Sequence, residues 1–542
     1  MYSRLAYAAF KFETSEGVMV KPDVFFPIVS QDIVTEYGSN PSMPIIGSRV
    51  ANINAIKNLI PSPEGTLGLQ IEPKTMGYFL KAVFGAITSG RMFPIELRLA
   101  AGSTTGTPAV GATLSQASTG ATAVVTALVS GNAYYVVRSV TVGFNASNLV
   151  TGTNPDGTTF TFTPSATLPV PNWTVGETVT GGTSSATAVI LAVSSENDYL
   201  LMGAPTGTFT AAGEAITGGT SSTKSNLLVN ASTVYGHEAK APQNTLPTMT
   251  LEIGLDDVAS RFGGVRLNAL SPIAQSDNIM TAEVAVTALN AFRLAEVTEA
   301  LAAGSGSKTI KVDQTTGLVA TDTIKVFRPS TGAFLDFSAS SVKTHAVGAV
   351  VNETSFTVTN VETALAVGDL IVLAPQTPSY SLAREFSWIG SSVVRAASSI
   401  VAAIAATPAG IEDYTLQIMN EIEGRHGANG TDLVNRFPIK NHLKAFKGEG
   451  TIKKAYLDQS FLARMRKATQ TAWHFNHIGD QIASTGLYYR LDLRVPNTVL
   501  RPHNLSFDQD SIVDEEIEFD LYRDATAGFT AKALLVNEVT SY

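Results

Sequence analysis

Hydrophobic side chains recur at helical spacing within residues 74–87 of this chain. Those that share one face of the expected helix are Met76, Phe79, Leu80, Val83, Phe84 and Ile87. Residues 248–289 change to an alternation of polar and apolar positions, which is typical of half-buried β-strands. The pattern therefore predicts a helix packed on a sheet, followed later in the sequence by three strands.

The same pattern occurs again nearer the end of the sequence. Residues 457–469 have the spacing of a helix, and residues 487–523 have the alternation of three strands. The two copies also share a short run, which reads NALS at residues 268–271 and HNLS at residues 503–506. An internal repeat that goes unnoticed leads to the wrong fold. A duplicated β unit indicates a protein that assembles with other copies rather than an enzyme.

Residues 101–235 have a different character, because Ala, Gly, Ser and Thr dominate them. They contain their own repeat: GATLSQASTGATAVV at residues 111–125 returns as GETVTGGTSSATAVI at residues 176–190, 65 residues later. Tyr134 and Tyr199 are separated by the same 65 residues. Alternating Thr and Val between Gly/Ser turns predicts two copies of one small β module.

Residues 301–375 open with a Gly/Ser linker and then contain four segments of strand character. These segments are residues 309–312, 323–327, 355–358 and 369–373. Strands are also expected at residues 381–388, 413–420 and 450–456. We expect a mainly β protein with a few helices, divided into a first unit (1–100 and 236–300), an inserted domain of two repeats (101–235), a small inserted β domain (301–375) and a second unit (376–542).

Composition agrees with many short strands joined by turns, since the 542 residues include 44 Gly and 24 Pro. The chain has no Cys, which excludes disulfides, thiolate zinc sites and Cys nucleophiles. Its net charge of -9 argues against tight sequence-independent DNA binding. The first residues lack the apolar core of a signal peptide, and the apolar stretch 396–409 is too short to span a membrane. We therefore expect a soluble protein made in a cytoplasm.

The run GSGSKT at residues 304–309 comes closest to a nucleotide-binding motif. A phosphate-binding loop needs Gly directly before its Lys, so that the backbone can wrap the phosphates. Here Ser307 precedes Lys308. The run is therefore interpreted as a linker.

Histidines and adjacent carboxylates are the other groups that could carry chemistry. His474 and His477 lie three residues apart, just past the expected second helix, and His503 follows. A zinc site needs a third ligand and a helix that holds the pair, so we expect structural or surface histidines. Glu515 and Glu516 are adjacent on an expected strand and must point to opposite faces. We expect no catalytic residue, cofactor site or metal site, and no enzyme.

A basic segment occupies residues 440–467. Its cations are Lys440, Lys444, Lys447, Lys453, Lys454, Arg464, Arg466 and Lys467. Such a cluster could bind nucleic acid, or it could meet an acidic face, such as residues 515–520, on a neighbouring subunit. The acidic balance of the whole chain favours the subunit contact.

Three segments resemble the tail tube proteins of bacteriophages. Residues 65–85 (GTLGLQIEPKTMGYFLKAVFG) resemble the part of that family in which a glycine-bearing helix follows an N-terminal strand pair. Residues 248–270 resemble the strand, loop and strand that follow it. Residues 414–424 (YTLQIMNEIEG) resemble the strand that ends in Asn before a long loop.

The resemblance covers roughly residues 1–100, 236–300 and 376–542. It implies two tube folds of β-sandwich or barrel type in one chain. The segments 101–235 and 301–375 resemble the small β domains that phage structural proteins carry on exposed surfaces. They are therefore expected to be decorations, inserted within the first unit and between the two units.

The resemblance also implies a function. Tube proteins form stacked rings, typically of six tube folds, around a channel through which genome DNA enters the host. Two folds per chain imply three chains per ring with pseudo-sixfold symmetry, whereas one enlarged fold would imply a homohexamer. Joined sheets leave few free edges, and an acidic lumen repels phosphates so that DNA slides. The implied partners are further copies, the tape measure, the tail terminator and distal tail or baseplate proteins, in a virion tail assembled in the host cytoplasm.

The sequence leaves two alternative functions open. One is a receptor- or glycan-binding tail or decoration protein, in which the 65-residue repeats bind carbohydrate. That function predicts clustered aromatic residues, whereas the repeats contain isolated ones such as Tyr134, Trp173 and Tyr199. The other alternative is a tube-like baseplate or distal tail component.

Overall fold

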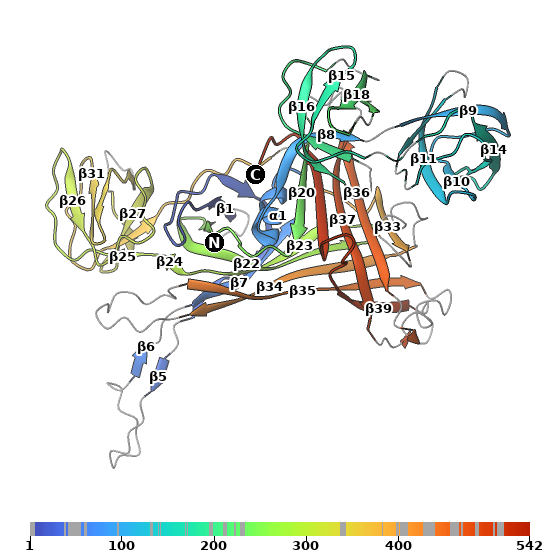
Figure 1. Ribbon diagram of the computed structural model, residues 1–542. Helices are drawn as coiled ribbons and strands as arrows, with labels where there is room; N and C mark the ends of the chain where they lie inside the picture. The colour runs from blue at the N-terminus through green and yellow to red at the C-terminus, as the bar shows by residue number, and fades with distance from the viewer. Residues whose placement is uncertain are drawn as a thin grey trace.

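Figure 1 shows the computed structural model, in which a long sheet carries smaller β domains towards both ends. Strands dominate the described part of the chain, so the prediction of a mainly β fold with few helices is confirmed. The structure describes residues 6–542 except 37–38, 42–55, 59–61, 95–96, 130–133, 139, 141, 169, 171, 195–198, 210–213, 222–223, 228–233, 337–342, 382, 397–399, 401–409, 426–439, 456–465, 468–469, 483–486, 502–504 and 507–513.

The first unit is an antiparallel ladder. Its described strands are β1 (Tyr7–Phe12), β2 (Val24–Phe26), β3 (Ile28–Gln31), β4 (Val34–Glu36), β7 (Ser62–Gln70), β21 (Met249–Leu255), β22 (Val258–Gln275), β23 (Thr281–Thr287) and β24 (Asn290–Phe292). They pair in the order β1–β21–β22–β23–β7, and β3 and β4 both pair with the far side of β7. The three strands expected after the first helix are confirmed as β21, β22 and β23.

The second unit repeats this ladder with the same chain order. Its described strands are β33 (Ser391–Ala396), β34 (Asp413–Arg425), β35 (Lys440–Ala455), β36 (Thr471–Gln481), β37 (Tyr488–Leu500), β38 (Leu505–Ser506), β39 (Asp514–Leu521) and β40 (Ala531–Asn537). They pair in the order β33–β36–β37–β39–β35–β34. Each strand thus has the same position as its counterpart in the first ladder, with β34 in the place of β3 and β4.

The two ladders also share a register shift. It lies between β21 and β22 in one unit, and between β36 and β37 in the other. The paired residues around it are Met249↔Val265 and Leu251↔Phe262, then Thr471↔Thr498 and Trp473↔Val495. In each case two steps along one strand face three along its partner, so the shift fixes which residues of the two units correspond.

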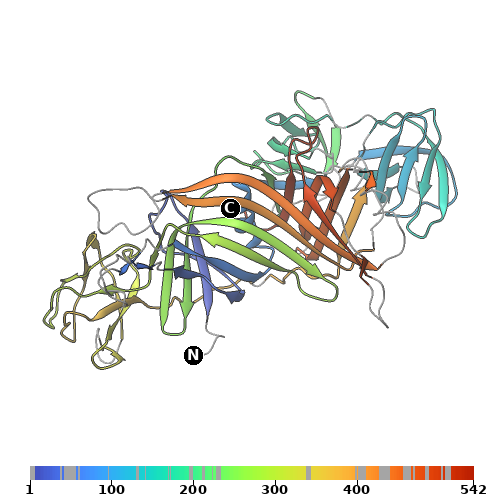
Figure 2. The ribbon, with the colours of Figure 1, turned by 90° about the horizontal axis from the view of Figure 1, so that it is seen from below.

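The units join through β22 and β34, which pair antiparallel between residues 269–275 and 413–419. The N–H of Ser276 donates to Asp413 Oδ1 at 2.9 Å and supports the end of this pairing. One sheet therefore runs through both units, and Figure 2 shows the long strands of the second unit beside those of the first.

The helix α1 (Met76–Phe84) covers the core side of the junction. Its apolar face is buried in one core with residues of both units. Gly85, at φ +88°, ends the helix, and its N–H donates to Lys81 O at 2.9 Å. The helix expected at residues 74–87 is thus confirmed. The second expected helix, residues 457–469, lies almost wholly outside the described residues.

Two similar β modules lie between β8 (Thr88–Pro94) and β20 (Tyr235–Ala241). The first is a closed barrel of β9 (Leu97–Thr105), β10 (Thr113–Gln116), β11 (Ala121–Val129), β12 (Tyr134–Arg138), β13 (Val150–Thr153) and β14 (Thr159–Pro164). The second contains β15 (Thr178–Gly181), β16 (Thr187–Val193), β17 (Tyr199–Met202), β18 (Glu214–Gly218) and β19 (Lys224–Leu227). Each strand from β15 to β19 begins 64 to 66 residues after its counterpart in the barrel.

In the second module β8 takes the place that β9 has in the barrel. β9 pairs with β12, and β8 pairs with β17 in the corresponding way. The other edge of β9 closes the barrel on β14, whereas the other edge of β8 pairs with β20, which itself pairs with β40. The second module is therefore built into the sheet of the second unit, while the barrel stands apart in Figure 1.

The remaining small domain, called the 301–375 domain below, follows the first unit. Its strands, counting the entry strand, are β25 (Ala295–Glu296), β26 (Lys308–Lys311), β27 (Thr323–Arg328), β28 (Ala333–Phe334), β29 (Thr344–Ala346), β30 (Val350–Asn352), β31 (Ser355–Val358) and β32 (Leu370–Leu373). The four expected strands are confirmed as β26, β27, β31 and β32. β32 also pairs with β22 at Ala259↔Leu373, so the domain is hydrogen-bonded to the first unit.

One expectation about strands was wrong, and one strand was missed. Residues 381–388 contain an isolated bridge, Ile279↔Ser387, and no described strand. Residues 471–481 form β36, although the sequence placed His474 and His477 merely after a helix. β36 is buried on both faces over most of its length, so it lacks the polar alternation by which a half-buried strand is recognised.

Candidate functional surface: the polar face and open edges of the long sheet

The long sheet has one apolar and one polar face. The core side of β34, β35 and β39 is buried and includes Leu416, Ile452 and Phe519. On the other side the paired rows are polar, such as Lys453 between Asp413 and Glu516. The polar face, as we use the term, comprises Glu64, Glu283, Asp413, Glu421, Lys447, Glu449, Lys453, Arg501, Glu516, Glu518 and Asp520.

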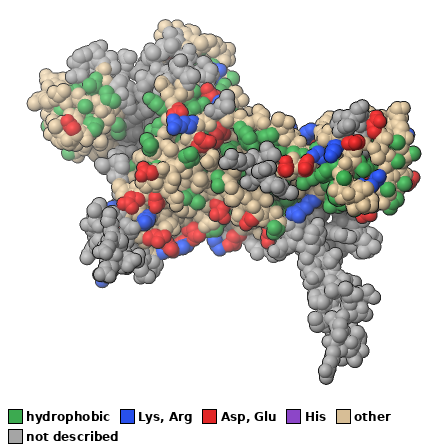
Figure 3. All heavy atoms as spheres, turned by 180° about the vertical axis from the view of Figure 1, so that it is seen from behind, with side chains coloured by type: hydrophobic (Ala, Val, Ile, Leu, Met, Phe, Trp, Pro, Cys, Tyr) green, Lys and Arg blue, Asp and Glu red, His purple; other side chains and the backbone are tan. Residues whose placement is uncertain are grey.

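The described part of this polar face is acidic, because its eight carboxylates outnumber its three cations. Arg501 donates to Glu449 at 2.6 Å and also bonds to Asp520, and these hydrogen bonds raise its pKa. Lys447 forms an ion pair with Glu421. The cations thus bind carboxylates of their own chain, and acidic side chains gather along the lower margin of the view in Figure 3.

Among the described strands, each unit leaves an edge of its ladder without a neighbouring strand. β34 has two neighbours, β35 and β22, whereas its counterparts β3 and β4 pair only with β7 among the described residues. The segment of β22 that receives β34 corresponds to β38, because Leu270↔Val284 is matched by Leu505↔Glu515. Within the described strands, β38 pairs with β39 alone.

The open edge of β4 presents main-chain donors. The N–H of Asp32 donates to Thr66 O of β7 at 3.1 Å. Main-chain groups alternate along an antiparallel strand, so the N–H of Val34 also points to β7 and that of Thr35 points away from it. Val29 and Val34 are exposed here. The edge resembles the one that β34 uses at the junction, and it is ready to pair with another strand.

The histidines expected to be structural are bonded inside the second unit. His474 Nε2 lies 2.9 Å from Asp492 Oδ1. His477 contacts Ser391 at 2.6 Å and also Tyr414. Within the described residues no group of three or more His, Cys, Asp or Glu is placed to hold a metal ion. His503 lies outside the described residues.

The other candidates occupy ordinary positions in the fold. Lys308 and Thr309 begin strand β26, whereas a phosphate-binding loop leads into a helix. Glu515 is buried and Glu516 exposed, so the prediction that they face opposite ways is confirmed. The sequence missed the pairing of β22 with β34, and the repeated run at residues 268–271 and 503–506 was the signal that could have led to it.

The predicted partner of the basic segment needs a correction. The described parts of that segment are β35 and the exposed residues Arg466 and Lys467, and β35 lies beside the acidic strand β39 of the same chain. Lys453 lies opposite Glu516, and Lys454 forms a buried ion pair with Glu515 at 3.4 Å. The charges of β35 and β39 therefore meet within one chain, because the ladder places the two strands side by side.

A scan against protein-family models matches no family, and a search of curated proteins finds no similar sequence. Among the described residues, no helix has the length and apolar character needed to cross a membrane.

Proposed function

We propose that this chain is a structural protein that assembles into rings, and that stacked rings form the tail tube of a bacteriophage. The tube is a channel for delivery of genome DNA into the host. The proposal rests on the tube-like segments of the sequence together with a ladder that occurs twice in one chain. The observation that carries it is the junction of β22 and β34 inside the chain.

The internal junction supplies a pattern for contact between copies. It joins the open edge of one unit to the receiving edge of the other. The same two kinds of edge, β3–β4 and β38, are left over at the outer sides of the two units. When β3–β4 of one copy adds to β38 of the next, every unit has the same neighbours and the ring closes with both of these edges paired.

The number of chains in the ring follows from this repetition. A ring of six tube folds requires three copies of a chain that contains two. We therefore propose a trimeric ring with pseudo-sixfold symmetry, while a ring of six copies remains the alternative if the two ladders act as one enlarged fold. Tape measure, tail terminator and distal tail proteins are proposed partners, in a virion tail assembled in the host cytoplasm.

The polar face suits the lining of such a channel. DNA carries one negative charge for roughly every 1.7 Å of helix axis. An excess of carboxylates over cations repels the phosphates, so that DNA can slide without being held. The strands β5 (Ser39–Pro41) and β6 (Ile56–Asn58) project away from the sheet in Figure 1, and we propose that they contact the adjacent ring.

Glycan binding by the repeats receives little support. The described aromatic side chains of the two modules include Tyr135, Trp173, Tyr199 and Phe209, and these are buried. A carbohydrate site needs aromatic rings on the surface. We therefore offer no second function.

The substitution Thr35→Pro tests the proposed contact between copies. It removes an N–H that points away from β7, and proline is tolerated on an edge strand. We expect chains that fold with the far-UV circular dichroism of the wild type but no longer form rings in electron micrographs. Val351→Pro, on the exposed edge strand β30 of the 301–375 domain, is the matched control and should leave ring formation unchanged. Rings formed by Thr35→Pro at the wild-type level would refute the proposed edge contact.

A further inference from the structure

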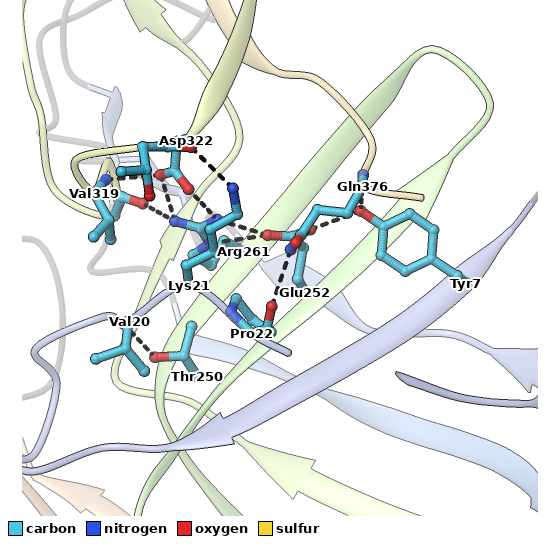
Figure 4. Close-up of polar contacts among 12 residues, drawn as sticks. Tyr7, Val20, Lys21, Pro22, Thr250, Glu252, Arg261, Val319, Asp322 and Gln376 are labelled. Atoms are coloured by element: carbon cyan, nitrogen blue, oxygen red, sulfur yellow. Dashed lines mark hydrogen bonds and ion pairs between the residues drawn. The ribbon is translucent and has the colours of Figure 1, made fainter. Parts of the chain in front are cut away.

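Arg261 of β22 is buried, with an exposure of 1%, and each nitrogen of its guanidinium group donates hydrogen bonds. Nε and Nη2 donate to Glu252 Oε2 at 3.1 and 2.7 Å. Nη1 donates to Gly317 O at 2.8 Å and to Asp322 Oδ2 at 2.7 Å, and Nη2 donates to Asp322 Oδ1 at 2.9 Å. All five N–H groups are therefore bonded. Figure 4 shows Arg261 between Glu252 and Asp322.

These bonds connect two parts of the fold. Arg261 and Glu252 belong to the first unit, whereas Gly317 and Asp322 belong to the 301–375 domain. Glu252 Oε1 also accepts hydrogen bonds from Tyr7 Oη at 2.6 Å and from Gln376 Nε2 at 2.8 Å. Because Gln376 lies where the chain leaves the domain, the network reaches both the domain and its exit (Figure 4).

Arg494 is the counterpart of Arg261 in the second unit. Arg261 lies opposite Glu252, one residue beyond the register shift, and Arg494 lies opposite His474, one residue beyond the matching shift. Arg494 has 0% exposure and donates from Nε and Nη2 to Asp492 at 3.0 and 2.7 Å. Burial alone would raise the pKa of Asp492, but Arg494 and His474 hold it well below its usual range.

Arg494 also reaches an inserted domain, and it is a different one. Its Nη1 lies 3.5 Å from Ser194 Oγ, and its guanidinium lies 5.6 Å from the centre of the Tyr199 ring. Both residues belong to the second module. The Tyr199 hydroxyl donates in turn to Glu238 of β20. Corresponding arginines of the two units thus contact the two domains that the units carry.

Apolar contacts and strand pairing also hold both domains: β32 pairs with β22, and the second module pairs through β8 and β20 with β40. The core of the 301–375 domain includes Ala259 and Phe292 of the first unit. Tyr199 and Leu201 of the second module share a core with Leu534 of β40. Hydrogen bonds to a planar guanidinium depend on angle, so the arginines add a second directional restraint on the orientation of each domain.

We propose that Arg261 and Arg494 are equivalent anchors, each of which fixes one inserted domain in a single orientation on its own unit. Each anchor acts within one chain and does not require ring formation. Given the ring proposed above, the two kinds of domain would alternate at corresponding places around it.

Spin labels measure the orientation directly, because the chain has no native Cys to interfere. One doubly labelled chain carries Val18→Cys on the first unit and Val351→Cys on the 301–375 domain. The other carries Ile389→Cys on the second unit and Val175→Cys beside the second module. All four side chains are exposed. Dilution with unlabelled protein restricts the measured distances to single chains.

We expect each wild-type pair to give one narrow distance distribution. Arg261→Met should broaden only the first pair, and Arg494→Met should broaden only the second. Lys11→Met, which breaks the exposed ion pair with Asp23, is the matched control and should change neither pair. If both pairs stay narrow in both variants, packing and strand pairing hold the domains without the arginines and the proposal is overturned. Broadening of both pairs by either variant overturns it equally.

A buried arginine can be essential for folding, so the anchors are also tested from the domain side. Asp322→Asn keeps the volume of the side chain and removes the charge that faces Arg261. Ser194→Ala removes the hydroxyl that lies 3.5 Å from Arg494 Nη1. Each should broaden its own pair only, and unchanged widths would overturn the proposal.

Discussion

The side-chain amide of Asn420 donates a buried hydrogen bond of 2.8 Å to the main-chain oxygen of Val83. Asn420 belongs to β34 of the second unit, and Val83 belongs to α1 of the first. Carbonyl groups in the last turn of a helix have no partner within the helix. Asn420 supplies one, and in doing so ties the two units together beside the junction of their sheets.

Replacement of Asn420 by Ala should weaken the whole fold. It leaves the buried carbonyl of Val83 without its donor, which costs about 1–3 kcal/mol of unfolding free energy. Denaturant titration measures this loss. Gln417→Ala, at a half-buried position of the same strand, is the control, and it should change stability by less than about 0.5 kcal/mol. An equal effect of the two substitutions would show that the contact with α1 is not important.

Two buried histidines should make the protein less stable in mild acid. Burial lowers the pKa of His477 to about 3 and that of His237 to about 4. Both values lie below about 6.5, the ordinary pKa of an unfolded His, so the folded state favours the neutral ring. The resulting stability is complete above about pH 6.5 and is lost as the pH falls toward the folded values, by up to a few kcal/mol for each group.

Unfolding free energies measured between about pH 7 and pH 4 test this dependence. His477→Gln keeps a polar side chain between Ser391 and Tyr414 but cannot titrate. We expect a shallower loss of stability with falling pH in this variant. Identical slopes in the wild type and the variant would contradict the assignment.

The barrel should unfold separately from the long sheet when its own packing is disturbed. A Cβ on Gly152 would lie 2.1 Å from the ring of Phe160, so Gly152→Ala should destabilise the barrel by about 1–3 kcal/mol through overpacking. Hydrogen exchange should then quicken in the barrel strands β9 to β14 only. Gly203→Ala is the control, since its Cβ would lie 3.7 Å from the nearest atom. Faster exchange throughout the chain would exclude an independent barrel.

Reversal of charge on the polar face should make the assembled protein hold DNA. Glu516→Lys combined with Glu518→Lys adds cations where carboxylates now repel phosphates. We expect salt-dependent binding of double-stranded DNA by rings of this variant and none by wild-type rings. Glu353→Lys with Glu362→Lys, on the 301–375 domain, adds the same charge elsewhere and should not create such binding. Equal DNA binding by both variants would show that the polar face does not line the channel.

Local pattern was enough to predict the first helix and most strands. Met76, Phe79 and Val83 share one face of α1, and Ile517 and Phe519 alternate with exposed carboxylates in β39. Such elements bury one side only, so their spacing appears in the sequence. Trp473 and Phe475 lie in β36, which is buried on both sides, and there the same reasoning failed.

Contacts between distant segments could not be predicted in this way. Nothing in the local sequence around Arg261 distinguishes it from a surface residue, because its burial depends on Asp322 in another domain. The pairing of Ala274 with Tyr414 likewise depends on how the two ladders meet. The basic and acidic strands were both identified, but the sequence alone did not show that one chain places them side by side.

The central claim is that three copies of this chain form one ring of six similar units. Purified protein imaged by electron microscopy, with the ring mass determined in parallel, tests it most directly. We predict rings with six similar lobes and a mass of three chains, in which the inserted domains reduce the true symmetry to threefold. Rings of six chains with true sixfold symmetry, or chains that remain monomeric, would contradict the account.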